Sequence, residues 1–512
     1  MGEHRILDIP LNRAEGDLEI RVEVADGVVV DAWSAGTMYR GIENLLVGRG
    51  SRDGLVITPR ICGICSTTHL TAAVRALDAV AGVAVPADAT RLRNVALMAE
   101  HIQSDVRQAV LMYLVDFAVP AYRSHPLHDE AVARYAPLRG TSCIETLKET
   151  KELLEIIGLI GGQWPHSAFM VPGGVVHAPG RVELMRCRQI VRDFRSWYER
   201  KILGCSLERW RQVRTAADLD AWTDENAAQR DGEVGFFLRF SRQAGLGGLG
   251  RGYGHFLSFG ALDLPADTRV QAPTPQLVAS GFVQDGVRSA FDPKGIAEHI
   301  ASSWFEGYEG GLHPFEGLTR PYASGPDGGR YSWAKAPRYQ GIPAETGPLA
   351  EFLVGGDPLF TDLVGTGGAD AVTRELARLV RPATLLDALD AWLEELLRAD
   401  TVDPYSPPGE IPDGQGAGLT QAARGALGHW VTISEGRIEH YQIITPTAWN
   451  ASPRDSGGVR GPWEEALVGT PIPDPEDVVA VGHVIRSFDP CLVCSVHAVR
   501  KGQSLGRAIL RA

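Results

Sequence analysis

The sequence predicts an α+β fold that is mainly α, with a core bundle of long helices and small β elements. Three observations carry this prediction. Apolar residues recur at helical spacing over several long segments, and strand-like alternation is confined to short stretches. Hydrophobic residues make up 44% of the 512 positions and charged residues 22%, an ordinary globular balance. A chain of this length can bury a large core without disulfides.

The β elements are expected near the N-terminus and in two later regions. Residues 17–33 alternate around Ala25-Asp26-Gly27 and predict a hairpin. Residues 230–290 and 430–445 are expected to hold the other small strands.

The helices are predicted from apolar residues at i, i+3 and i+4 and from their stop signals. The longest cover residues 88–117, 144–162, 180–204 and a pair over 368–399 that is broken near Pro382. No repeat or low-complexity linker interrupts the chain, so one integrated domain is expected.

Charge and cysteine content limit the partners and the compartment. The net charge of −13 makes nucleic acid an unsuitable partner. The N-terminus lacks the apolar stretch of a secretory signal, and no run of 18 apolar residues predicts a membrane span. Seven cysteines in 512 residues suit a reducing compartment, so a cytoplasmic location is expected. Export with a signal-bearing partner, and association with a membrane through partners, stay open.

Two CxxC pairs, Cys62 with Cys65 and Cys491 with Cys494, are the main chemical signal. Each pair can direct two thiolates at one metal ion. A structural zinc site is the plain alternative, but zinc ribbons space their pairs by roughly 12–20 residues. A redox CxxC lacks a thioredoxin-like βαβ context here. The spacing therefore favours a metal site built from distant segments.

The two cysteine segments, "RICGICSTTH" and "DPCLVCSVH", resemble the signatures of the large subunit of nickel–iron hydrogenases. "GGQWPHSAFMVPGGV", "ARGALGHW" and "TPTAWN" match further stretches of that family in order, so the resemblance covers nearly the whole chain. The wording "GICSTTH" and "SFDPCLVCSVH" is most similar to the cytoplasmic uptake type of actinobacteria and cyanobacteria.

The resemblance implies a nickel–iron centre that splits H2 into protons and electrons, with uptake the favoured direction. By position, Cys62 and Cys491 would be terminal nickel ligands. Cys65 and Cys494 would bridge nickel to an iron that carries one CO and two cyanides. Soft thiolates suit a metal that changes oxidation state.

Other residues receive roles from the same register. The polar and apolar partners of the diatomic ligands would be Arg424, Thr447, Leu427 and the backbone at Ala423, with Asp489 orienting Arg424. His69 would donate a hydrogen bond to a bridging sulfur, and Glu15 would take protons from a terminal thiolate.

A magnesium ion is the second cofactor that the resemblance implies. Glu43, the carbonyl of Ile443 and His497 would hold it beside the C-terminal end of the mature chain.

The chain departs from the family pattern in two places near the expected site. The usual Ala-Pro-Arg is replaced by Ala422-Ala423-Arg424, and the usual His-Asp-His by Gln103-Ser104-Asp105. Ser104 stands where a carboxylate over nickel is expected, and Asp105 lies about 100° round the helix. Which of the two serves as the polar group there stays open.

Residues 1–497 would form the hydrogenase domain, and 498–512 a C-terminal extension with four basic side chains that is removed on maturation. A maturation endopeptidase and nickel-insertion proteins would then be partners. Cys143, Cys187 and Cys205 lack iron–sulfur spacing, so electrons would leave through iron–sulfur clusters in a small subunit only. A higher oligomer of heterodimers is expected. The alternative function is a slowly turning H2 sensor, and a zinc scaffold is a more distant one.

Overall fold

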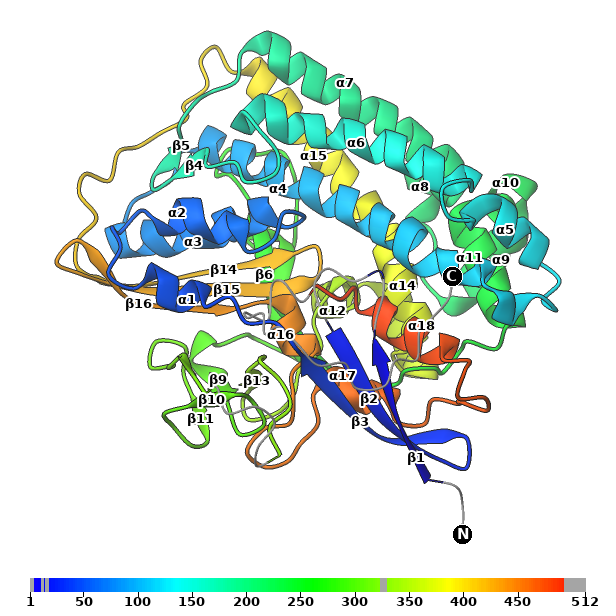
Figure 1. The fold of residues 1–512 in the computed structure, drawn as a ribbon. Helices are drawn as coiled ribbons and strands as arrows, with labels where there is room; N and C mark the ends of the chain where they lie inside the picture. Colours follow the sequence, from blue (N-terminus) through cyan, green and yellow to red (C-terminus); the bar gives the residue numbers. More distant parts are fainter. Residues whose placement is uncertain (1–3, 11–12, 14–17, 323–328, 492–512) are drawn as a thin grey trace.

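Long helices stack side by side in one half of the molecule, and small sheets lie beneath them (Figure 1). The structure, a computed structural model, describes residues 4–10, 13, 18–322 and 329–491. The long helices are α3 (Ser66–Ala81), α4 (Ala87–Arg107), α6 (Thr141–Gly161), α7 (Arg181–Tyr198) and α15 (Pro382–Arg398), and the shorter α14 (Ala371–Val380) precedes α15. The mainly helical α+β prediction is confirmed.

The apolar pattern explains which helix faces are buried. In α7, Leu184, Cys187, Val191 and Phe194 recur at three- or four-residue spacing and are buried, while the intervening residues are mostly charged. The break between α14 and α15 falls at Pro382, as predicted, because proline occupies the first position of α15 and cannot continue α14.

Two predicted helices change their winding before they end. After α4 the chain continues as the π-helix η2 (Gln108–Tyr113) and the 3₁₀-helix η3 (Leu114–Ala118). After α7 it continues as the π-helix η5 (Glu199–Leu203). The apolar pattern runs through both transitions, so the sequence did not reveal the changes in winding.

The remaining helices are short and connect the main elements. They are α1 (Ile42–Leu46), α2 (Gly54–Ile57), η1 (Thr58–Arg60), η4 (Pro120–Tyr122), α5 (His128–Tyr135), α8 (Leu207–Trp210), α9 (Ala216–Glu225), α10 (Ala227–Asp231), α11 (Glu233–Gln243), η6 (Pro293–Gly295), α12 (Pro348–Gly355), α13 (Pro358–Gly367), α16 (Pro446–Asn450), α17 (Pro462–Leu467) and α18 (Val479–Ser487).

The three largest antiparallel sheets among the described residues have three strands each. They are β1 (His4–Pro10), β2 (Leu18–Ala25) and β3 (Val28–Gly36); β6 (His255–Asp263), β7 (Gln276–Gln284) and β8 (Val287–Ser289); and β14 (Gly414–Ala422), β15 (Gly425–Ser434) and β16 (Arg437–Ile444). The smaller pieces are β4 (Met170–Val171), β5 (Gly174–Val175), β9 (Ile296–His299), β10 (Phe305–Glu306), β11 (Gly311–Leu312), β12 (Arg320–Pro321) and β13 (Ala336–Tyr339).

The predicted hairpin is confirmed as β2 and β3, joined by a turn in which Asp26 and Gly27 have positive φ. The other two predicted regions also contain strands, with β6, β7 and β8 in 230–290 and β15 and β16 across 430–445. Two features of these regions were not anticipated. The 230–290 region begins with helix α11, whose buried Val234, Phe237 and Ser241 follow helical spacing. The third sheet also includes β14, which lies before the 430–445 region and whose glycines hid the strand pattern.

Those glycines let α3 lie directly on the sheet. A Cβ on Gly418 would overlap the carbonyl oxygen of Ala72, and one on Gly416 the carbonyl oxygen of Ala76. Since Cys65 is the residue that precedes α3, this close packing fixes the helix that carries the first cysteine pair. Among the described residues, no helix combines the length and hydrophobicity required to cross a membrane.

We expect Gly418→Ala to destabilise the protein by about 1–3 kcal/mol, because a methyl group must push α3 away from β14. Gly158→Ala is the matched control. A Cβ there meets nothing within 4 Å and Gly158 lies inside α6, so this change should stabilise by about 0.5–1 kcal/mol. Denaturant unfolding of both variants measures the difference. Equal stability of the two would contradict the packing of α3 on β14.

Candidate metal centre

Three cysteine sulfurs converge in a buried cluster. The Sγ atoms of Cys62, Cys65 and Cys491 all lie within 4.8 Å of one another, and that of Cys62 is 3.5 Å from that of Cys491. Each of the three side chains is at most 4% exposed. The predicted convergence of the two CxxC segments is therefore present for the three cysteines that the structure describes.

Separate elements bring the sulfurs together. Cys62 lies in the turn after η1, and Cys65 precedes the first turn of α3. Cys491 follows α18, and its backbone N–H donates to Oγ1 of Thr447 in α16 at 3.2 Å. Leu427 in β15 is 1% exposed. The segment that follows α18 therefore meets α16 and the turn before α3 at the sulfur cluster.

Arg424 is the cation that faces this cluster. Its Nη2 lies 3.0 Å from Oδ1 of Asp489, and it is 6% exposed. Burial alone would lower the pKa of Arg424, but Asp489 and the three cysteine thiolates raise it well above its usual value. The Nε and Nη1 atoms have no hydrogen-bond partner among the described residues, so two buried donors are left for a bound group.

Asp489 belongs to a buried ladder of alternating charges. Its Oδ2 lies 3.2 Å from Nη1 of Arg378, and that nitrogen is 3.3 Å from Oδ1 of Asp105. Arg381 pairs with Asp105 and with Glu351, both at 2.7 Å. Glu351, Arg378 and Arg381 were not recognised from the sequence. The periodicity of their helices shows only that these positions are buried.

The ladder accounts for both departures from the expected pattern. The carbonyl oxygen of Ala423 accepts from Arg378 at 3.2 Å and from Arg381 at 2.9 Å, which fixes the backbone without a proline. The carboxylate of Asp105 is occupied by the two arginines, whereas Oγ of Ser104 and Oε1 of Gln103 have no partner among the described residues. Ser104, rather than Asp105, is thus the residue with a polar atom to spare.

His69 lies in a buried hydrogen-bonded row. Its Nδ1 is 3.1 Å from Nε2 of His429, whose Nδ1 is 2.9 Å from the hydroxyl of Tyr441. Burial lowers the pKa of His69 to about 4, although the nearby Cys62 thiolate acts in the opposite direction. His69 is therefore a neutral ring with one nitrogen fixed by His429. Both partners were missed in the sequence.

Glu43 lies in a second polar cluster. Its Oε1 accepts from the backbone N–H of Ile443 at 2.9 Å, and its other oxygen accepts from Thr319. Nζ of Lys335 is 3.9 Å from both Glu43 and Glu298. Burial, with a smaller contribution from Glu43, raises the pKa of Glu298 above its usual value. Glu298 and Lys335 are also absent from the sequence prediction.

Three predicted residues, Glu15, Cys494 and His497, lie outside the described part of the chain. The other cysteines are not in the sulfur cluster. Burial raises the pKa of Cys143 to about 11 and that of Cys187 to about 12, and Cys205 accepts from Trp222 at 3.3 Å. Cys143 and Cys187 are buried, and Cys205 is partly buried.

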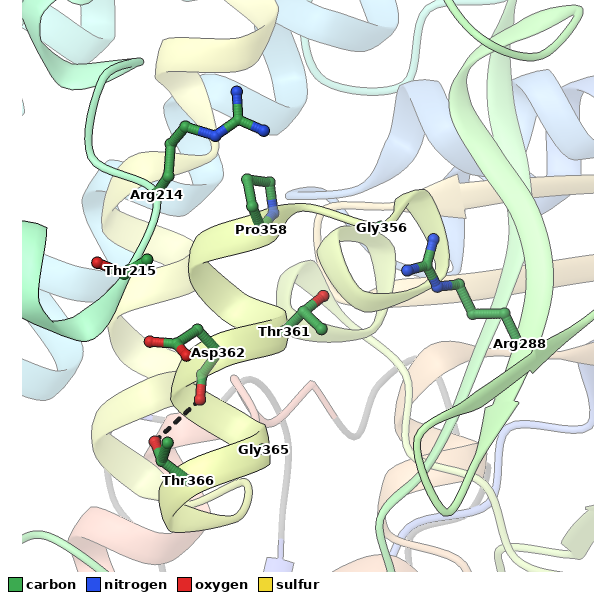
Figure 2. Close-up of a pocket in the computed structure, with 9 residues that line it drawn as sticks. All are labelled: Arg214, Thr215, Arg288, Gly356, Pro358, Thr361, Asp362, Gly365 and Thr366. Atoms are coloured by element: carbon green, nitrogen blue, oxygen red, sulfur yellow. Dashed lines mark hydrogen bonds between the residues drawn. The ribbon is translucent and has the colours of Figure 1, made fainter.

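A surface cavity of about 530 Å³ lies elsewhere, between α13, the start of α9 and β8 (Figure 2). Arg214 and Arg288 line it from different sides, and none of the predicted site residues takes part. The chemistry is therefore concentrated at the buried sulfur cluster and not in this cavity.

The donor set at the cluster suits a thiolate-preferring transition metal. The three buried sulfurs, which lie within 4.8 Å of one another, are soft ligands, and Cys494 of the second CxxC pair would be a fourth. The positive charge of Arg424 offsets the negative charge of the thiolates. The two nitrogens of Arg424 without a partner among the described residues, Nε and Nη1, can donate to small acceptor ligands on such a metal. Around Glu43 the donors are carboxylate oxygens, which suit a hard cation.

Comparison with known proteins gives consistent matches. The family described as nickel-dependent hydrogenase matches residues 40–117 and 240–497. The periplasmic [NiFeSe] hydrogenase large subunit of Desulfomicrobium baculatum is 33% identical, with 97% of this chain and 96% of the relative covered. The uptake hydrogenase large subunit of Rhodobacter capsulatus is 28% identical, with 97% and 95% covered.

Solved structures agree with these sequence matches. An H2-activated [NiFeSe]-hydrogenase structure from Dm. baculatum has a TM-score of 0.82 at 31% identity, covering 97% of this chain and 100% of that one. The reduced Ni-Fe-Se hydrogenase of D. vulgaris Hildenborough has a TM-score of 0.81 at 32% identity, with the same coverage.

We expect Cys65→Ala to reduce the nickel content of the purified protein from about one ion per chain to near none, because it removes one thiolate of a closed set. Cys187→Ala is the matched control, since that cysteine is equally buried but lies in α7. Elemental analysis of both variants measures the effect. Full nickel content in Cys65→Ala would show that the cluster is not the nickel site.

Proposed function

Since the chain belongs to the nickel-dependent hydrogenase family as a catalytic large subunit that oxidises H2, we propose that Cys62, Cys65, Cys491 and Cys494 together hold its nickel–iron centre. The convergence of the three described sulfurs is the observation that supports this most directly. Cys62 and Cys491 would be terminal ligands of nickel, and Cys65 and Cys494 would bridge to an iron with one CO and two cyanides.

The bound metal pair supplies the polarisation that H2, a poor acid, needs for heterolytic cleavage. The protein supplies the proton acceptors: Sγ of Cys491 or Cys494, or a water molecule held by Arg424. Arg424 itself stays cationic, because Asp489 and the thiolates raise its pKa. Its role is to hold and polarise acceptor ligands through Nε and Nη1. Glu15 would carry the proton onward. His69 would donate a hydrogen bond to a bridging sulfur.

The pocket around iron would be formed by few side chains. Arg424 and Thr447 would bind the cyanides, Leu427 would be the apolar wall, and Asp489 would orient Arg424 through their 3.0 Å contact. The carbonyl oxygen of Ala423 accepts hydrogen bonds from two arginines, which supports a rigid backbone beside this pocket.

We also assign a magnesium ion to Glu43, Ile443 and His497. The cluster of Glu43 with Glu298 supports a hard cation nearby, since carboxylate oxygens are its preferred ligands. Lys335 occupies the same region and would balance the two carboxylates before the ion binds.

A hydrogenase large subunit implies a small-subunit partner. We propose that this partner carries the iron–sulfur clusters, since the other three cysteines lie outside the sulfur cluster. Such heterodimers would assemble into a higher oligomer. The complex would be cytoplasmic and would associate with a membrane through its partners. The wording of the two signatures supports the cytoplasmic uptake group of actinobacteria and cyanobacteria.

We propose that residues 1–497 form the hydrogenase domain and that 498–512 are removed by a maturation endopeptidase after nickel insertion. The family match ends at residue 497, which supports this boundary. Removal would let the C-terminal histidine close over the metals last.

We expect Arg424→Lys to lower H2 oxidation by about 10²–10³-fold, since lysine keeps the charge but loses the directed N–H groups. The assay uses the complex of both subunits and an artificial acceptor, and the nickel content should stay close to that of the unmodified protein. Arg338→Lys is the control, because Arg338 is fully buried and pairs with Asp455 at 2.7 Å in another region.

Near-full turnover by loaded Arg424→Lys would contradict the role of Arg424. The same assay addresses the sensor alternative. A fully loaded unmodified complex with only slow turnover would favour sensing over catalysis.

We expect the intact mass of the active, nickel-loaded large subunit to correspond to residues 1–497. Chains isolated from cells grown without nickel should keep all 512 residues, because cleavage would follow metal insertion. Mass spectrometry of both preparations measures this. Active protein that still contains Ala512 would refute the processing step.

A further inference from the structure

Glu375 is a buried carboxyl group that the assigned functions leave without a role. It lies in α14, is 0% exposed, and neither of its oxygens has a hydrogen-bond partner among the described residues. A carboxylate that is buried and unpaired is strongly unfavourable unless it is protonated or hydrated. Burial raises its pKa to about 8, despite the opposing effect of Arg378. At neutral pH the group is therefore largely a carboxylic acid.

Its neighbours connect it to the metal centre. The charged groups that act on Glu375 are Arg378 from its own helix, Asp105 from α4 and Asp489 from the segment after α18. Arg378 contacts Asp489, which holds Arg424. Nε of Arg378, like Nε and Nη1 of Arg424, has no partner among the described residues. Buried donors of this kind hold internal water.

On its other side Glu375 faces polar groups of the π-helix η2. The amide nitrogen of Gln108 donates to the carbonyl of Arg486 at 2.6 Å, and it also lies close enough to the carboxyl group of Glu375 to lower its pKa, against the larger effect of burial. This leaves Oε1 of Gln108 as an acceptor for a protonated Glu375. Tyr113, five residues on, is 0% exposed with an unpartnered hydroxyl, and Glu375 is the charged group that acts on it most strongly. π-helical turns are common at functional sites.

From Tyr113 polar groups continue to the surface. The rings of Tyr113 and His483 in α18 have centroids 5.1 Å apart. Nδ1 of His483 has no partner among the described residues, and Nε2 is 2.9 Å from the hydroxyl of Tyr122. Burial lowers the pKa of His483 to about 4, so the ring is neutral and can both accept and donate. Tyr122 is only partly buried.

We propose that Glu375, Tyr113, His483 and Tyr122, linked by internal water, form a second proton route from the Arg424 side of the metal centre to the surface. The route runs between η2, α14 and α18, which contact one another; α14 and α18 lie side by side in Figure 1. It rests on the proposed H2-splitting function. It is separate from the relay assigned to Glu15, which begins at a terminal thiolate.

Each transfer conserves protons and charge. Water at Arg424 and Arg378 delivers a proton to one oxygen of Glu375, and the other oxygen releases its own. The hydroxyl of Tyr113 accepts that proton on oxygen and passes on the one it carried. Neutral His483 accepts at one ring nitrogen and releases at the other, and Tyr122 delivers a proton to solvent. The arginines hold water and do not titrate.

The test compares holoenzyme variants in the complex of both subunits. Glu375→Gln keeps the shape but removes the transferable proton, whereas Glu375→Asp keeps the carboxyl. We expect Glu375→Gln to lower kcat roughly tenfold, less than a direct catalytic acid because a parallel relay remains, with unchanged KM for H2 and a larger solvent isotope effect. Glu375→Asp should recover most of the rate. Tyr113→Phe should act like Glu375→Gln.

Tyr198→Phe is the control for Tyr113→Phe, since Tyr198 is equally buried but donates to the carbonyl of Leu379 at 2.7 Å. An independent readout is infrared absorption. The carboxylic acid C=O band of Glu375 should shift in D2O and vanish in Glu375→Gln, whatever the rate.

Unchanged kcat and isotope effect in loaded Glu375→Gln and Tyr113→Phe would overturn the route. If Glu375→Gln does not load metal, kcat and the solvent isotope effect of Tyr113→Phe and His483→Gln decide whether the route exists. An unmodified complex that carries nickel and iron but does not oxidise H2 would instead refute the proposed function.

Discussion

The close approach of thiolates from opposite ends of the chain is the constraint on which the rest of the structure depends. Cys62 and Cys491 are 429 positions apart in sequence, yet their sulfurs are 3.5 Å apart in a buried site. Thiolates so close repel one another unless cations offset them. The packing of α3 on the glycines of β14, the contact of Cys491 with Thr447 and the charge of Arg424 together make this approach possible.

The buried charge ladder extends this constraint into the helical bundle. From Arg424 through Asp489, Arg378, Asp105 and Arg381 to Glu351, charges of opposite sign alternate. Removing one member of such a set leaves an uncompensated buried charge, which costs about 3–5 kcal/mol. The ladder therefore holds the backbone at Ala423 in place, because the carbonyl oxygen there accepts from both Arg378 and Arg381. The same contacts occupy the carboxylate of Asp105, whereas the hydroxyl oxygen of Ser104 has no partner among the described residues.

Local patterns predicted the helices, the N-terminal hairpin and the paired cysteines, because these signals are contained in neighbouring residues. The residues that surround the site were harder to predict. Glu351, Arg378 and Glu375 read as ordinary members of amphipathic helices, since a sequence pattern shows burial but not the partner across the interface. β14 was missed because its glycines serve contact with α3 rather than strand propensity. The winding change at Gln108–Tyr113 leaves no mark on hydrophobic periodicity.

Metal analysis combined with infrared spectroscopy of the purified complex tests most directly whether the converging thiolates hold a nickel–iron pair. We expect about one nickel per large subunit, with iron beyond that of any iron–sulfur clusters in the partner. We also expect absorption bands of bound CO and cyanide in the spectral window where protein does not absorb. Zinc as the only metal, with no such bands, would contradict a nickel–iron centre and would make the cysteine cluster a structural site.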